Sequence, residues 1–127
     1  MGLQDFLAGP DLLVQPLDEA DAPRLQRLFE ACADYFQRCA LPLAADEALV
    51  DLRSLPPADF AWAAQWHLGI VQPGSDTLLA CLQVCSEAPA AGVWHLGLLM
   101  VHPAQRGRGL ARRLVAALEA WAAQCGA

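Results

Sequence analysis

The sequence predicts an α/β (α+β) domain whose sheet is mostly antiparallel and is flanked by helices. Apolar residues recur at helical spacing in one long segment of the N-terminal half and again at the C-terminus. Between them lie three apolar stretches separated by short turns rich in Gly, Pro and Ser, as in consecutive antiparallel strands. With 127 residues the chain is long enough for one core and too short for two, so we expect residues 1–127 to form a single domain.

The N-terminal part is expected to contain a short strand followed by two helices. Residues 11–16 predict the strand. Asp21 is a suitable N-cap for a helix that runs to about Arg38. The apolar stripe of this helix is Leu25, Leu28, Phe29, Cys32 and Phe36. Residues 46–52 predict a second, short helix, which ends before a pair of prolines.

The C-terminal part is expected to contain three strands and a helix. Residues 66–71 and 77–85 predict a hairpin around a Pro- and Gly-containing turn. Residues 93–101 predict the most hydrophobic strand, in which only His95 is polar, so both its faces should be covered. The apolar stripe of the last helix is Leu110, Leu114, Leu118, Trp121 and Cys125. The predicted order is therefore β-α-α-β-β-β-α.

The composition excludes several classes of function. The chain contains no lysine, which excludes a Walker-type phosphate loop and Schiff-base chemistry. None of its serines lies in a Gly-x-Ser-x-Gly sequence, so a serine hydrolase is not expected. The five cysteines lack zinc spacing. Cys81, Cys85 and His95 could be imagined as ligands, but we expect buried thiols and no metal.

The chain also lacks signals for membranes and export. The longest apolar stretch, around residues 94–101, is too short to span a bilayer, and the first residues lack the basic region of a secretory signal. We therefore expect a cytoplasmic protein that does not act at a membrane.

Positive charge is concentrated in one short segment. The net charge of −6 argues against a nucleic-acid partner. Yet four of the eight arginines lie between Arg106 and Arg113. An acidic protein that places half of its positive charge within eight residues is expected to use that segment for an anion.

This segment has the features of an anion-binding turn. An apolar strand ends at Val101, Pro103 begins a turn, and Gly107 and Gly109 precede a helix. The first N–H groups of a helix lack internal partners and lie at the positive end of its dipole. Glycine has no Cβ, so a phosphate can approach the backbone closely. Arginines in and after the turn add positive charge.

Two other interpretations of the turn are open. An ordinary strand–turn–helix connection with a solvated basic face would also use two glycines, because short glycine motifs are weakly specific. A dinucleotide-binding turn fits less well. It requires a third glycine where Arg112 stands, and the preceding strands do not form a βαβ unit.

The segment resembles the acyl-CoA pyrophosphate loop of GNAT-type N-acetyltransferases. Residues 106–111, Arg-Gly-Arg-Gly-Leu-Ala, fit the Arg/Gln-x-x-Gly-x-Gly/Ala signature of that family. The preceding Leu-Met-Val-His-Pro is similar to the strand that leads into it, and residues 110–125 resemble the family's third helix. The order of elements is also similar, so the likeness covers most of the chain.

The resemblance implies a co-substrate, acetyl-CoA, and an amine acceptor from a small molecule or peptide. In such enzymes the pantetheine arm pairs with the strand before the loop, and loop and helix-start amides hold the pyrophosphate. Carried over to this sequence, the cofactor-binding residues are Leu99, Met100, Val101, Arg106, Gly107, Arg108, Gly109, Leu110 and Ala111. The amine attacks the thioester directly, and a strand amide stabilises the oxyanion.

His95 is the candidate general base that takes the proton of the amine. It stands eleven residues before Arg106, where some histone-acetylating members of the family carry a glutamate. Histidine titrates near neutral pH, which suits the role. The alternative is a structural histidine in an apolar strand. His67 and His102 are weaker candidates, and His102 is expected to belong to the turn.

The resemblance also suggests that the chain is incomplete. Family members continue past the third helix with a strand, a helix and a hairpin. That part supplies the second wall of the cofactor cleft and often a tyrosine that protonates the leaving thiolate. The sequence given ends at residue 127, and its one tyrosine, Tyr35, lies in the first predicted helix. Residues 93–101 would then be an unpaired edge, open to a homodimer or another partner chain.

Three functions therefore stand at this point. The chain could be an N-acetyltransferase, a non-catalytic CoA-binding module, or a fragment completed by a partner chain. The acceptor depends on residues 39–66 in this architecture, and these carry no interpretable motif.

Overall fold

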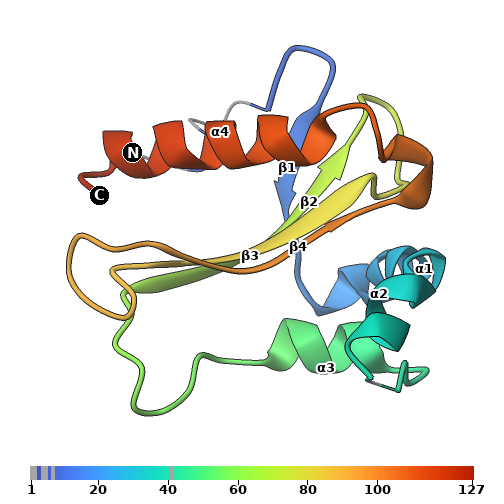
Figure 1. Cartoon of the computed structure of the whole chain (residues 1–127), viewed down its shortest axis with the longest axis horizontal. Helices are drawn as coiled ribbons and strands as arrows, with labels where there is room; N and C mark the ends of the chain where they lie inside the picture. The colour runs from blue at the N-terminus through green and yellow to red at the C-terminus, as the bar shows by residue number, and fades with distance from the viewer. Residues whose placement is uncertain (1–2, 4–5, 7, 41) are drawn as a thin grey trace.

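A computed structural model describes residues 3, 6, 8–40 and 42–127, which form three layers. A four-stranded sheet lies in the middle, α4 crosses one face, and α1, α2 and α3 lie on the other face (Figure 1). The elements in order are β1 (Leu13–Pro16), η2 (Glu19–Asp21), α1 (Ala22–Ala31), α2 (Ala33–Arg38), α3 (Glu47–Arg53), β2 (Ala64–Val71), β3 (Ala80–Ser86), β4 (His95–Val101), η3 (Pro103–Gln105) and α4 (Leu110–Gln124). The predicted fold class and mostly antiparallel sheet are confirmed.

The helix predicted from Asp21 to Arg38 is two helices. Asp21 is the residue before α1, but its carboxylate accepts a hydrogen bond from the Asp18 N–H in the capping box of η2. The chain leaves helical geometry at Cys32, which has ψ 30°. Cys32 is fully buried, and its Sγ lies 3.4 Å from the Val101 carbonyl oxygen. The break lets α2 turn toward the end of β4.

The sheet has the order β1-β2-β3-β4, and every neighbouring pair is antiparallel. β4 is therefore an outer strand of the described sheet. Its register with β3 shifts by one residue, because Gln83 is opposite Leu98 whereas Val84 is opposite Leu96. Gly97 is the extra residue of this β-bulge, and a bulge bends its strand and leaves one residue outside the ladder.

Two apolar clusters hold the layers together. The cluster under α4 is built around Trp121, whose ring contacts Phe6, Trp66 and Trp94 at centroid distances of 5.0–5.4 Å. The cluster on the other face joins the helices α1 to α3 to the strands, and Phe29 and Cys32 are at its centre. The edge-to-face pairs that Trp121 forms in the first cluster add to the free energy gained from burial.

The expectation that both faces of the 93–101 strand are covered is wrong for its first half. Val93, His95 and Gly97 are exposed, whereas Met100 is buried under the helices. The physical reason is that α3 ends at Arg53, and the segment after it covers this face incompletely, because a cavity lies between Leu55, Phe60 and the strand at His95. The face of β4 is therefore covered only near Met100, and a cavity remains beside His95.

Among the described residues, no helix has both the length and the apolar character needed to cross a bilayer.

Candidate functional site

The turn between β4 and α4 borders a cavity that is open to solvent. Gly107 and Gly109 have φ values of 77° and 76°, in the left-handed region that favours glycine. A Cβ built on either glycine would meet nothing within 4 Å, so the surface above both is free. The cavity measures about 520 Å³, and its lining comprises Val101, Gln105, Arg106, Gly107, Gly109, Leu110, Ala111 and Arg112.

Helix α4 begins at this cavity, and the backbone N–H groups of its first turn have no hydrogen-bond acceptor within the helix. Gly109 is its N-cap and has no side chain to accept a hydrogen bond from the first turn. The N–H groups of Leu110, Ala111 and Arg112 therefore have no partner within the helix. They lie at the positive end of the dipole of a 15-residue helix. Such an arrangement can bind a phosphate group through backbone amides.

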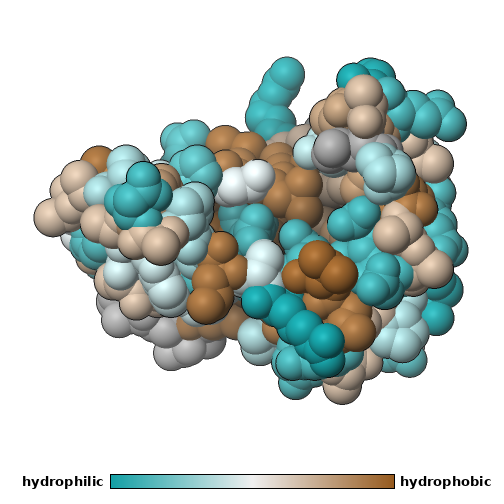
Figure 2. All heavy atoms as spheres, turned by 90° about the horizontal axis from the view of Figure 1, so that it is seen from below, coloured by the Kyte–Doolittle hydropathy of each residue, from teal (hydrophilic) through white to brown (hydrophobic). Residues whose placement is uncertain are grey.

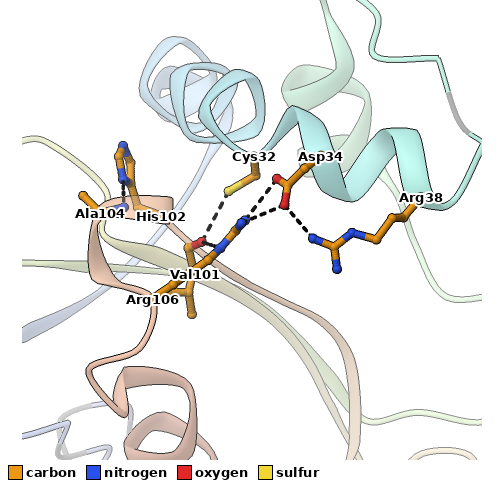
Figure 3. Close-up of polar contacts among 7 residues, drawn as sticks. All are labelled: Cys32, Asp34, Arg38, Val101, His102, Ala104 and Arg106. Carbon is orange, nitrogen blue, oxygen red and sulfur yellow. Dashed lines mark hydrogen bonds and ion pairs between the residues drawn. The ribbon is translucent and has the colours of Figure 1, made fainter.

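Arg106 has a structural partner of its own. Its guanidinium donates to both carboxylate oxygens of Asp34 in α2, at 2.7 and 3.2 Å, and its Nε donates to the Val101 carbonyl at 3.3 Å (Figure 3). Asp34 also accepts a hydrogen bond from Arg38 at 2.6 Å. Hydrogen bonding from Arg106 is the main cause that lowers the pKa of Asp34 to about 2. Arg106 thus fastens the turn to β4 and to α2.

The other three arginines of the cluster differ in their partners. Arg113 points to the N-terminal segment, where it pairs with Asp11 and donates to the Ala8 carbonyl at 2.7 Å. Arg108 and Arg112 form no ion pair with any described residue. Both are exposed, and Arg112 lines the cavity. The positive charge available to an anion therefore comes from Arg108 and Arg112.

The free edge of β4 leads away from this cavity. The His102 N–H donates to the Leu79 carbonyl at 2.8 Å, so His102 and, by alternation, Met100 face β3. The backbone groups of Leu99 and Val101 consequently face the open edge. The backbone of Met100 belongs to the ladder with Cys81, and its side chain is buried.

A second cavity lies beside the bulge, on the face of the sheet that carries α3. It measures about 300 Å³ and is enclosed by the end of α3, the segment after it, and the exposed part of β4. Figure 2 shows this face, where apolar and polar surfaces lie side by side between the helices and the segment before β2. His95 lines the cavity, and its ring contacts Phe60 edge-to-face at a centroid distance of 5.4 Å.

Gln83 has an orientation fixed by hydrogen bonds. The Ser54 hydroxyl donates to the Asp51 carbonyl at 2.6 Å, so its oxygen can accept from the Gln83 Nε2 at 3.3 Å. The carboxamide oxygen of Gln83 then faces the bulge. It lies 3.2 Å from the point where a Cβ on Gly97 would be, and the His95 Nε2 lies 3.7 Å from the same point. One acceptor and one imidazole thus flank the space above Gly97.

Of the remaining candidates, only Cys85 lines one of the two cavities, the one beside His95. His67 Nδ1 is 3.6 Å from the Asp51 carboxylate under α3, and His102 Nδ1 accepts a hydrogen bond from the Ala104 N–H at 3.0 Å within the turn. Tyr35 lies on α2. Cys81 and Cys85 share one face of β3 and are buried, and burial raises the pKa of both thiols. No group of described residues could hold a metal ion.

Sequence reasoning did not find Gln83, Ser54 or Phe60. Gln83 is the one carboxamide in an otherwise apolar strand, and Gly97 interrupts a run of leucines, which is a recognised sign of a bulge. These two signals could have indicated where the cavity lies. Ser54 and Phe60 come from a segment without a motif, so only the tertiary structure brings them to the site.

Comparisons with known proteins agree on one family. The family described as "Acetyltransferase (GNAT) family" matches residues 24–127. No curated protein sequence matches the chain significantly.

Solved structures with a similar fold are acetyltransferases. One is an acetyltransferase from Thermus thermophilus, with TM-score 0.73, 23% identity, and coverage of 87% of this chain and 68% of the other. Another is a tandem GNAT protein from the clavulanic acid biosynthesis pathway, with TM-score 0.66, 24% identity, and coverage of 91% and 34%. A third is a ribosomal-protein-alanine N-acetyltransferase from Brucella melitensis biovar Abortus 2308, with TM-score 0.59, 22% identity, and coverage of 89% and 72%. At these identities the similarity establishes the fold and not a shared substrate.

The Asp34–Arg106 pair predicts an acid-sensitive contribution to stability. The pKa of Asp34 is lower in the folded chain, about 2, than the value of about 4 expected in the unfolded chain. Its contribution is therefore complete above about pH 4 and is lost as pH falls toward about 2. In thermal unfolding, Asp34→Asn should lower Tm by a constant amount near neutral pH, and this difference should shrink over that acidic range.

The matched control is Asp59→Asn, which removes an exposed carboxylate that has no ion pair among the described residues. A Tm difference for Asp34→Asn that stays constant down to pH 2 would contradict the assignment.

Proposed function

Because this chain belongs to the GNAT acetyltransferase family, we propose that it transfers an acetyl group from acetyl-CoA to an amine of a small molecule or peptide. The observation that supports the proposal is that β4 borders two cavities. Val101, at one end of the strand, lines the cavity at the start of α4, and Gly97 and His95, toward the other end, line the second cavity. We also propose that residues 1–127 act as one domain around these two cavities.

The loop cavity would hold the pyrophosphate of CoA. Its donors are the first N–H groups of α4, and the positive φ values of Gly107 and Gly109 let a phosphate lie against the backbone. Arg108 and Arg112 would add charge. Arg106 would act mainly by holding the turn in place, because its guanidinium is occupied by Asp34.

The pantetheine arm would follow the open edge of β4. Leu99 and Val101 direct backbone groups to this edge, although the Val101 carbonyl already accepts from Arg106. Gly97 lies four positions before Val101, roughly 13 Å away at a rise of ~3.3 Å per residue. An extended arm anchored at the loop would thus bring its thioester to the bulge.

The reaction at the bulge would be a direct transfer. The amine nitrogen attacks the thioester carbonyl carbon, a C–N bond forms, the C–S bond breaks, and CoA leaves as a thiolate. Gly97 has no partner residue in β3, so an N–H at the bulge could donate to the oxyanion. The amine must lose one proton, and His95 at the wall of the second cavity would accept it.

A second candidate is a CoA-binding chain that needs a partner for catalysis. One observation favours it. The indole N–H of Trp94 is buried and has no hydrogen-bond acceptor among the described residues. Trp94 also lines a cavity of about 390 Å³ between β4 and α4. A partner segment added beside β4 would offer the carbonyl group that this indole lacks.

Binding of CoA should depend on Arg108. Arg108→Ala removes a positive charge beside the loop without breaking any ion pair among the described residues, and should weaken CoA binding about tenfold, or ~1.4 kcal/mol. Isothermal titration calorimetry at low ionic strength measures this effect. The matched control is Arg27→Ala, which removes an exposed arginine of α1 and should leave the affinity unchanged.

If the parent chain does not bind CoA, the proposed function and the CoA-binding alternative both fail. If CoA binds but acetyl-CoA yields no product with a broad panel of amines, the partner-dependent candidate is supported.

His95→Gln should reduce turnover more than binding. Loss of a general base lowers kcat by about 10²-fold or more, whereas KM for acetyl-CoA should change little because the loop is intact. The loss in kcat should narrow at alkaline pH, since an amine that is already neutral needs no base. Steady-state release of CoA over a pH series measures both parameters. His67→Gln, which changes a histidine outside the cavity, is the control, and equal effects of the two variants would exclude His95 as the base.

A further inference from the structure

The cavity beside His95 has walls of two kinds. One wall is apolar and consists of Leu55, Pro56, Pro57 and Phe60. Leu55 is 73% exposed, so an apolar ligand in the cavity would cover a side chain that water now surrounds. The opposite wall carries polar side chains, among them Gln83 and His95. No aspartate or glutamate is among the described residues that line it.

A seat for one nitrogen atom lies at the bulge end of this cavity. The Gln83 Oε1 and the His95 Nε2 both lie within 4 Å of the empty Cβ position of Gly97. The Gln83 oxygen is held in this direction because its amide nitrogen donates to Ser54. A primary amine at this point could donate one N–H to Gln83 and direct another toward His95. Gln83 is not among the described residues that line the loop cavity, so a change at Gln83 tests the second cavity separately.

The charge of the cavity limits what else the acceptor can carry. A second ammonium group placed inside would have no carboxylate to pair with, and burying an unpaired charge is strongly unfavourable. A carboxylate on the ligand would likewise face carboxamides and an apolar wall, with no arginine or lysine among the described lining residues. The volume of about 300 Å³ is at the small end of the range for ligand cavities.

We infer that the acceptor is a small primary monoamine with an apolar alkyl or aryl body, and that Gln83 is the residue that accepts a hydrogen bond from its nitrogen. This inference rests on the proposed function, since it assigns the acceptor of the same reaction. The apolar body packs against Phe60 and Leu55, and the nitrogen lies above Gly97. Polyamines and aminoglycoside-like polycations are poor ligands of this cavity.

The first test compares three ligands with the parent chain saturated with CoA. The probes are 2-phenylethylamine, 2-phenylethanol, which lacks the nitrogen, and spermidine, which is a polycation. Calorimetry or ligand-observed NMR at mildly alkaline pH gives the dissociation constants. 2-Phenylethylamine should bind at least about tenfold more tightly than either of the other two. Equal or tighter binding of spermidine, or of 2-phenylethanol, would overturn the inference.

The second test changes the charge of the nitrogen seat. Gln83→Glu adds a carboxylate of nearly the same shape and should reduce the preference for 2-phenylethylamine over spermidine by about tenfold. Gln72→Glu adds the same charge in the exposed turn after β2 and should leave the preference unchanged. Phe60→Ala should weaken 2-phenylethylamine about tenfold and leave spermidine unaffected. A preference that is the same in Gln83→Glu and the parent would remove Gln83 from the acceptor site.

Acetyl transfer is measured separately, by mass spectrometry with acetyl-CoA. If 2-phenylethylamine binds with the expected pattern and no acetylated product forms, the proposed function fails and the assignment of the cavity stands. If spermidine is acetylated with a higher kcat/KM than 2-phenylethylamine, the proposed function stands and the inference about the acceptor is overturned. The comparison of ligands on the parent chain does not depend on whether any variant folds.

Discussion

The ion pair between Arg106 and Asp34 connects the glycine turn to the rest of the fold. Through it and the bond to the Val101 carbonyl, the turn is fixed to α2 and to the end of β4. Asp34 lies on α2, just after the helix break at Cys32, and is within hydrogen-bonding distance of Arg106 in the turn (Figure 3). The ion pair also changes the role of the first arginine of the signature. Arg106 supports the loop, and we propose that the backbone amides of α4 bind an anion together with Arg108 and Arg112.

The bulge at Gly97 is the second constraint, because it decides what lies at the other end of β4. In a regular strand, successive side chains alternate between the two faces, so His95 and Gly97 would lie on the face opposite Leu98 and Met100. Because Gly97 is an extra residue, His95 and Gly97 instead lie beside the second cavity, on the same face as Leu98 and Met100. A side chain at position 97 would fill the space between Gln83 and His95. One strand, β4, thus borders both cavities, which we propose to bind the CoA pyrophosphate and the acceptor.

The sequence predicted the parts of the fold and site that depend on local patterns. The fold class follows from periodicity, and the strand–turn–helix segment follows from periodicity together with the signature at residues 106–111. The partners of Arg106 and Arg113 could not be predicted, because Asp34 and Asp11 are 72 and 102 residues away along the chain. The cavity beside His95 could not be predicted for the same reason. Ser54, Phe60 and Gln83 meet only after the segment behind α3 folds over the sheet.

The central claim is that backbone amides of the glycine turn and the first turn of α4 hold the pyrophosphate of CoA. Amide proton and nitrogen chemical shifts of the labelled chain, followed during titration with CoA, test it most directly. The account predicts that the largest shifts occur at Gly107, Gly109, Leu110 and Ala111, and that inorganic pyrophosphate alone shifts the same amides at higher concentration. Saturable CoA binding that leaves these amides unshifted would contradict the account.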